Sequence, residues 1–191
     1  MDNKSREVMD YIFQRRSIRK YLDKDVKEDD LVLLLKAAMA APTAANRQPW
    51  EFIVVTNREK MVELRSTLRE GQYNARAAIV VCGNLKLAFS NKDKEIWVQD
   101  CSAAVENILI AAAGIGLGSV WIGLYPQINK CKPVCKILNI PDHVIPMSVV
   151  YIGYPDECKE PRTQYNEKRV YWQEYEPNRK HRARPKNLKY I

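Results

Sequence analysis

Hydrophobic and polar positions along this chain follow two periods, one of three to four residues and one of two. Side chains three or four positions apart share one face of a helix, so the longer period predicts amphipathic helices. Short runs of β-branched residues lie between them and predict buried strands. The predicted helices span 6–16, 31–40, 58–69, 95–114 and 130–138, and the predicted strands span 51–56, 77–82, 119–124 and 144–153.

The predicted helix at 95–114 is apolar on all sides over its second half, which is typical of a helix inside the molecule. It leads into an uncharged stretch, 108–124, that holds four glycines. A membrane helix needs about 20 apolar residues with few interruptions, so this stretch instead predicts a buried helix that turns into a strand. Helices and strands alternate along the chain, which favours an α/β or α+β fold.

The chain from residue 156 onward reads as extended and irregular, with one candidate strand at 169–172. Loops of this length are uncommon in a compact monomer. The segment also carries several aromatic residues, which favours an arm that wraps around a second copy, so we expect a homodimer. The length of 191 residues fits one domain, residues 1–176, followed by a short tail, residues 177–191.

Most of the net charge of +8 comes from this tail, which holds six basic residues and no acidic one. Its Arg-Ala-Arg-Pro-Lys core lacks the interleaved aromatic residues that stack on bases, which favours a solvated extension over nucleic-acid binding. The first residues carry mixed charge and lead into no apolar segment, so we expect a cytoplasmic protein that does not bind membranes.

Five cysteines without a secretory signal predict free thiols in a reducing compartment. Cys131 and Cys135 form an isolated CxxxC pair, and the chain has only two histidines, so we expect packing or surface thiols and no metal. The glycines at 114–118 follow a predicted helix rather than a strand, which argues against a dinucleotide loop. A sequence this poor in candidate acids and bases fits chemistry that a cofactor carries.

Two polar segments indicate what that cofactor is. The first places three guanidinium groups and a hydroxyl at the end of a predicted helix, in Arg15, Arg16, Ser17 and Arg19. Guanidinium groups bind phosphate through paired hydrogen bonds, although arginines at a helix end also interact with the helix dipole when they are merely solvated.

The second segment, residues 41–50, is bounded by prolines and has no acidic residue before Glu51. Its neutral hydrogen-bonding groups suit the carbonyls of a heterocycle, although an ordinary helix-to-strand loop would also be polar. Further along, Gly123 removes a side chain where backbone can approach a flat ligand. Together the segments favour a phosphorylated, ring-bearing cofactor over a nucleic acid.

At this point the sequence resembles the nitroreductase family of FMN-dependent oxidoreductases over most of residues 8–172. Five segments carry the resemblance, in family order: residues 15–19, 41–50, 100–112, 116–123 and 152–155. The resemblance implies an α+β fold with a mixed, largely antiparallel sheet flanked by helices, in a homodimer with swapped arms. It makes residues 1–176 the FMN-binding domain, with FMN at the interface between the two subunits.

The resemblance also implies roles for individual residues. The phosphate and ribityl chain would be held by Arg15, Arg16, Ser17 and Arg19, with a further phosphate contact from Arg162. The other subunit would reach the ring with Pro42, Thr43, Asn46 and Gln48. Ile122 and Gly123 would lie along the isoalloxazine.

The activity that follows from the resemblance is hydride transfer from NAD(P)H to flavin N5, and then to a small acceptor such as a nitroaromatic or a quinone, in a ping-pong cycle. One alternative keeps the fold but changes the chemistry to dehalogenation, flavin fragmentation or dehydrogenation. Another is a flavin-binding regulatory module whose basic tail contacts nucleic acid. No residue of the sequence indicates a choice between NADH and NADPH.

Overall fold

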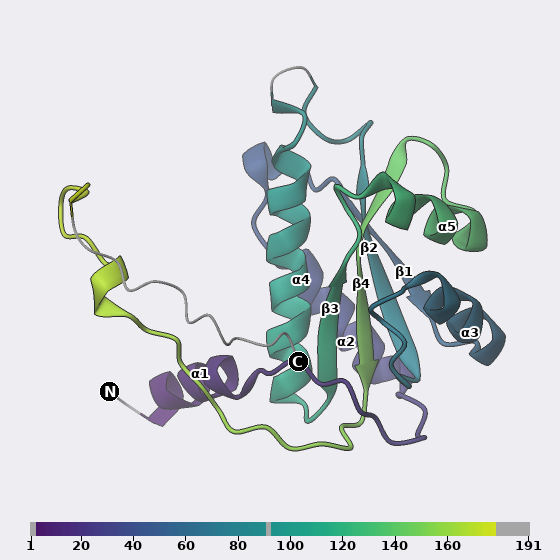
Figure 1. Cartoon of the computed structure of the whole chain (residues 1–191), viewed down its shortest axis with the longest axis horizontal. Helices are drawn as coiled ribbons and strands as arrows, with labels where there is room; N and C mark the ends of the chain where they lie inside the picture. Colours follow the sequence, from purple (N-terminus) through teal and green to yellow (C-terminus); the bar gives the residue numbers. More distant parts are fainter. Residues whose placement is uncertain (1–2, 91–92, 179–191) are drawn as a thin grey trace. The chain divides into compact units, whose positions relative to one another are not determined.

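The computed structural model describes residues 3–90 and 93–178 and divides the chain into two units, Met1–Pro161 and Arg162–Ile191. The first unit is an α+β fold in which helices cover both faces of one sheet (Figure 1). The described part of the second unit contains one short 3₁₀ helix, η3 (Glu167–Arg169). The expected α+β class is confirmed.

The sheet has four strands in the order β1-β2-β4-β3, and all three neighbouring pairs are antiparallel. The strands are β1 (Trp50–Val55), β2 (Ala77–Asn84), β3 (Gly118–Gly123) and β4 (Val144–Gly153). The parallel component that was expected is limited to an isolated bridge between Ser17 and Ser119, beside β3. β1 and β3 are therefore the edge strands of the described sheet.

Two layers of helices bury the sheet. The helices are α1 (Asn3–Gln14), α2 (Glu28–Met39), α3 (Arg58–Thr67), α4 (Ile96–Gly114) and α5 (Ile128–Leu138), with a short 3₁₀ helix, η1 (Ala44–Asn46). Figure 1 shows α4 on one side of the sheet and α3 and α5 on the other. Alternate residues of β2 serve the two sides: Ile79 packs in the core under α2 and α4, and Val80 packs in the core under α3 and α5.

Local sequence signals explain where several elements begin and end. Asn57 caps α3, because its side chain accepts a hydrogen bond from the Lys60 N–H at 2.9 Å. Asn139 ends α5 in the left-handed conformation, with φ of 52°. Within the core, Gly83 allows α4 to approach β2, because a Cβ at this position would lie 2.1 Å from the Trp97 ring.

The five predicted helices and the four main predicted strands are present, with ends that differ by up to three residues. α1 stops at Gln14, two residues before the predicted end, because the chain then becomes extended and pairs Ser17 with Ser119. α5 begins at Ile128, so Pro133 is its sixth residue rather than part of its first turn.

The candidate strand at 169–172 is wrong, because Asn166 caps the turn η3 there through a 3.0 Å bond from the Lys168 N–H. The predicted basic tail, residues 177–191, lies outside the described residues except for Pro177 and Asn178. No helix in the described ranges has the length and hydropathy to cross a bilayer.

Candidate functional site

The arginine-rich segment lies where α4 gives way to β3. Ile18 anchors it: its side chain is buried, and its N–H donates to the Ser119 carbonyl at 2.9 Å. Gly118 makes room for this contact, since a Cβ there would lie 2.7 Å from Ile18. Neighbouring side chains of an extended segment alternate in direction, so burying Ile18 leaves the half-buried Ser17 and Arg19 on the opposite side.

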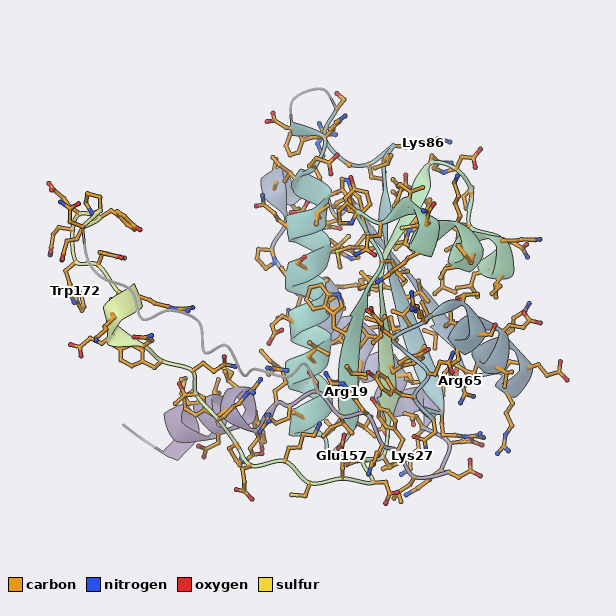
Figure 2. All side chains as sticks on the ribbon, viewed as in Figure 1. Arg19, Lys27, Arg65, Lys86, Glu157 and Trp172 are labelled. Carbon is orange, nitrogen blue, oxygen red and sulfur yellow. The ribbon has the colours of Figure 1, made fainter. Side chains whose placement is uncertain are left out.

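The chain that follows β4 binds this segment from outside. Oε1 of Glu157 accepts hydrogen bonds from the N–H groups of Arg19 at 2.5 Å and Lys20 at 3.3 Å. Nζ of Lys159 donates to the Ser17 carbonyl at 2.7 Å and lies 3.3 Å from Glu157 Oε1. Figure 2 shows Arg19 and Glu157 at the same end of the sheet. Sequence reasoning singled out neither Glu157 nor Lys159.

The charges at this end favour an anion. Arg15 pairs with Glu106, with 3.4 Å between Nε and Oε1. The Arg16 guanidinium donates to the backbone carbonyl of Glu160, and the Arg19 guanidinium lies over the Tyr73 ring. Within the described part of the chain, neither Arg16 nor Arg19 forms an ion pair with a carboxylate. Both guanidinium groups therefore keep donors for a ligand such as phosphate.

The second polar segment, residues 41–50, has a strained backbone. Three of its non-glycine residues adopt the left-handed conformation: Ala45 with φ of 48°, Asn46 with φ of 51° and Gln48 with φ of 50°. Each costs about 1–3 kcal/mol and persists only where the surrounding structure holds it, and such strain gathers at functional sites. Pro42, Asn46 and Gln48 are exposed, and Thr43 is half-buried.

Hydrogen bonds hold this loop in its strained shape. The buried carboxylate of Asp100, on α4, accepts from the Ala44 N–H at 2.9 Å. The Thr43 hydroxyl accepts from the Gln48 N–H at 3.1 Å, and the Gln48 side-chain amide donates to Asn46 Oδ1 at 2.8 Å. The loop therefore holds its side-chain amides in fixed positions. Asp100 supports the loop from α4, a role that the sequence motifs did not reveal.

A single chain does not bring the two segments together. The loop is fastened to Asp100 near the start of α4, whereas Ser17 is fastened to Ser119 beyond its end. The α4 residues from Asp100 to Gly114 span about 21 Å of helix rise. Figure 1 shows α1, which leads into the arginine segment, beside the C-terminal end of α4.

Ile122 and Gly123 end the edge strand β3. The half-buried Ile122 side chain lies against Gly71 and packs on the core under α3 and α5. A Cβ on Gly123 would meet nothing within 4 Å, and this residue is exposed. The Ser119 carbonyl points away from β4, because it accepts from the Ile18 N–H. Carbonyl directions repeat every two residues along a strand, so the carbonyls of Trp121 and Gly123 point to the same edge of β3. Arg162 begins the second unit, and its role stays a prediction.

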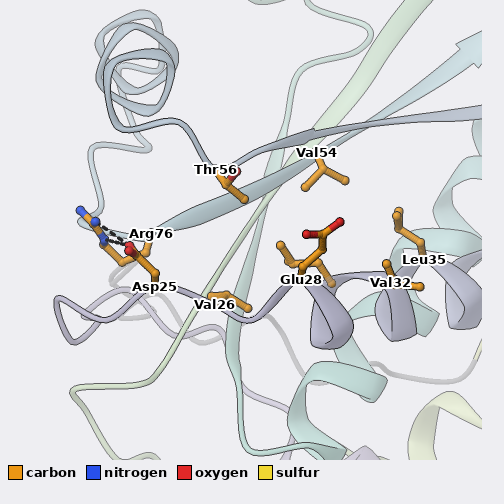
Figure 3. Close-up of a pocket in the computed structure, with 9 residues that line it drawn as sticks. Asp25, Val26, Glu28, Val32, Leu35, Val54, Thr56 and Arg76 are labelled. Atoms are coloured by element: carbon orange, nitrogen blue, oxygen red, sulfur yellow. Dashed lines mark hydrogen bonds and ion pairs between the residues drawn. The ribbon is translucent and has the colours of Figure 1, made fainter.

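A pocket of about 650 Å³ lies elsewhere, between the start of α2 and β1 (Figure 3). Its walls are mainly apolar side chains, including Val32, Leu35 and Val54. Its one guanidinium, Arg76, is already bound by Asp25, with 2.6 Å between Nη2 and Oδ1. None of the predicted site residues is among those that line it, and its two carboxylates, Asp25 and Glu28, disfavour a phosphate.

Two of the buried thiols, Cys101 and Cys131, are poor candidates for a nucleophile. Burial, and then the nearby Asp100 carboxylate, raise the pKa of Cys101 to about 12. Burial, and then Cys135, raise the pKa of Cys131 to about 11. Both thiols are therefore protonated at neutral pH, and the thiolate is the reactive form.

The fold and these two segments define an α+β protein with guanidinium groups gathered beside the start of one edge strand. A model of the Nitroreductase family matches residues 12–81 and 69–154. The chain belongs to this family.

A protein of Archaeoglobus fulgidus named "Putative NADH dehydrogenase/NAD(P)H nitroreductase" is 47% identical over 156 residues, which cover 81% of this chain and 88% of that protein. A solved structure from Bacteroides thetaiotaomicron with the same name is 37% identical, with a TM-score of 0.84, and covers 92% of this chain and 100% of its own. The structure of an "FMN-dependent Nitroreductase" from Clostridium difficile is 31% identical, with a TM-score of 0.79, and covers 87% of this chain and 99% of its own.

Proposed function

We propose that this chain is an FMN-dependent oxidoreductase that uses NAD(P)H to reduce a small acceptor, such as a nitroaromatic or a quinone. The observation that carries the proposal is the arginine segment, fixed beside the start of β3, with two guanidinium groups that pair with no carboxylate among the described residues. The relative from A. fulgidus is named for NAD(P)H, and the C. difficile structure is named for FMN. Both names agree with the chemistry of this segment.

The residues present fit FMN at its phosphate end. Arg16, Ser17 and Arg19 lie within one extended stretch and offer guanidinium and hydroxyl donors. Each charge-assisted hydrogen bond contributes roughly 1.5–3 kcal/mol, so two or three suffice to retain a mononucleotide. Gly123 would give the ring a flat approach to the backbone of β3.

Asn46 and Gln48 fit the polar edge of the ring. Their exposed side-chain amides present both donors and acceptors on a loop whose shape is already fixed. When bound, FMN would supply the redox chemistry, accepting a hydride from NAD(P)H and passing the electrons on. The chain's own part is to bind the phosphate and to orient the ring.

We further propose that two copies share each site. The ring-facing loop and the phosphate-binding segment are too far apart in one chain, since they lie toward opposite ends of α4. α1 presents an apolar face to solvent, with Val8 61% and Ile12 39% exposed. Trp172, in the second unit, is 77% exposed, as expected of an arm that packs on a second copy. A cytoplasmic location stays a prediction.

The test is to purify the chain and record its absorbance, its mass by light scattering and its oxidation of NADH and NADPH with nitrofurazone or a quinone. The expected result is a yellow dimer that turns over with one of these pairs. Arg16→Ala should lose flavin on dialysis, and Arg69→Ala, which removes an exposed arginine from outside the site, should not. A colourless protein that takes up no FMN from an excess would refute the proposal.

Two other results would favour the alternatives. Bound flavin with very slow turnover would favour a specialised reaction on the same fold. Retention of RNA or DNA at moderate salt, lost when residues 177–191 are deleted while flavin reduction persists, would favour the binding module.

A further inference from the structure

We propose that Glu157 and Lys159 are positioning residues that set the affinity for the phosphate of FMN by fixing the Ser17–Lys20 backbone and by cancelling each other's charge beside it. This inference rests on the proposed function. Neither residue belongs to the segments from which the family resemblance was drawn, and neither needs to touch the ligand.

Glu157 and Lys159 bind the backbone on both sides of Ile18. Lys159 holds the Ser17 carbonyl at 2.7 Å, and Glu157 holds the two N–H groups that follow Ile18, at 2.5 Å and 3.3 Å. Ile18 itself is fixed by burial and by Ser119. The Asp156 N–H adds a bond to the Lys20 carbonyl at 2.9 Å. Four consecutive residues are thus held from two sides, which leaves the Ser17 and Arg19 side chains pre-oriented for a ligand.

The charges of the pair matter separately from these bonds. Partial burial alone would raise the pKa of Glu157, but hydrogen bonds from the Arg19 N–H and the Lys159 ammonium outweigh it and lower that pKa. Glu157 is therefore an anion at neutral pH, next to the segment that must attract a phosphate dianion. The Lys159 ammonium, 3.3 Å from its Oε1, compensates this charge.

Two consequences distinguish this arrangement from a merely structural one. Removing the ammonium should weaken binding of the phosphate twice over, because the bond to Ser17 is lost and the Glu157 charge is left uncompensated. Neutralising Glu157 in the same protein should then recover part of the loss. Riboflavin has the same ring and no phosphate, so neither change should alter its affinity appreciably.

The experiment measures the dissociation constants of FMN and riboflavin for the flavin-free full chain, by quenching of flavin fluorescence. The variants are Lys159→Met, Glu157→Gln and the double variant. We expect Lys159→Met to weaken FMN on the order of tenfold or more and riboflavin less than twofold, consistent with the loss of one charge-assisted bond. The double variant should regain several-fold in FMN affinity.

A second ion pair, between the half-buried Lys130 and the exposed Glu70 at 3.6 Å, provides controls. Lys130→Met and Glu70→Gln should change neither dissociation constant. Equal losses for FMN and riboflavin in Lys159→Met, or no loss at all, would overturn the inference while leaving the proposed function intact. A wild-type chain that binds neither flavin would instead refute the proposed function. If Lys159→Met does not fold, Lys159→Gln, which removes the charge but keeps a donor, must still weaken FMN more than riboflavin.

Discussion

At the scale of single residues, Gly83 and Gly123 of the sheet are glycine for different reasons. At Gly83 an added Cβ would lie 2.1 Å from the Trp97 ring, so the absence of a side chain serves the fold. At Gly123 an added Cβ would meet nothing within 4 Å, so the fold does not require glycine there. A flat ligand needs such open space beside an edge strand. We therefore expect Gly123 to matter for ligand binding and not for folding stability.

Gly123→Val should therefore separate binding from folding. The flavin-free variant should melt within a few degrees of wild type, because the new side chain enters open space. Its FMN affinity should fall sharply, because that side chain occupies the approach to the backbone. Gly83→Ala is the contrasting control, and overpacking against Trp97 should lower the free energy of unfolding by about 1–3 kcal/mol. A Gly123→Val protein with a normal flavin spectrum would contradict the assignment.

The Glu157 carboxylate also makes stability depend on pH. Its pKa is lowered in the folded chain, because backbone N–H groups and Lys159 outweigh the effect of partial burial. Its contribution to the free energy of unfolding is thus complete above the ordinary glutamate pKa of about 4.3 and is lost as the pH falls through the lowered value.

We expect wild type to be more stable than Glu157→Gln near pH 7, and we expect this difference to shrink below about pH 4. Urea unfolding of the flavin-free proteins at a series of pH values measures it. The same comparison with Glu70→Gln should show a much smaller dependence, since that carboxylate is exposed and pairs at 3.6 Å. A difference that stays constant from pH 7 to pH 3 would argue against the role of the ionised carboxylate.

At the scale of elements, the loop between α2 and β1 shows how a polar segment becomes a fixed surface. Its left-handed residues at 45, 46 and 48 include no glycine, so the strain must be held by other contacts. Asp100 is the contact from outside the loop, and it lies 6% exposed in the first turns of α4. The central helix thus sets the shape of the loop as well as filling the core.

Asp100→Ala should release the loop. The Ala44 N–H would lose its acceptor, which costs about 1–3 kcal/mol of unfolding free energy, and FMN affinity should fall because the ring-facing amides are no longer fixed. Asp100→Asn keeps an acceptor oxygen and should lie close to wild type in both measurements. Urea unfolding and FMN titration of the two variants test this, and full affinity in Asp100→Ala would show that the loop needs no support from α4.

The elements themselves are readable from sequence where the signal is local. The apolar stripe of α4 and the β-branched run of β2 fix those elements to within about two residues. The candidate strand at 169–172 failed because a strand requires a partner, which local pattern does not provide. The left-handed residues of the loop were not predictable, since none is glycine. Glu157 and Lys159 act on residues about 140 positions away and leave no local signature.

At the scale of the whole molecule, the positions of the two site segments carry the strongest consequence. One chain fixes the arginine segment beyond the C-terminal end of α4 and the amide loop near its N-terminal end. A ligand that needs both must take them from different copies, or the site must use only one. A symmetric dimer would repeat the same arrangement twice and create two shared sites.

Mixing two inactive variants distinguishes these arrangements. In a shared site, Arg16→Ala disables the segment from one chain, and Gln48→Ala disables the loop from the other. A dimer of one Arg16→Ala chain and one Gln48→Ala chain has one site with both defects and one site with neither. Unfolding and refolding the two variants together at equal amounts should therefore restore about a quarter of the wild-type sites, measured as bound FMN and as NAD(P)H oxidation. Either variant refolded alone should show no such recovery. If each chain holds its own complete site, the mixture will equal the average of its two parents, and the shared-site model must be abandoned even if the protein is a dimer.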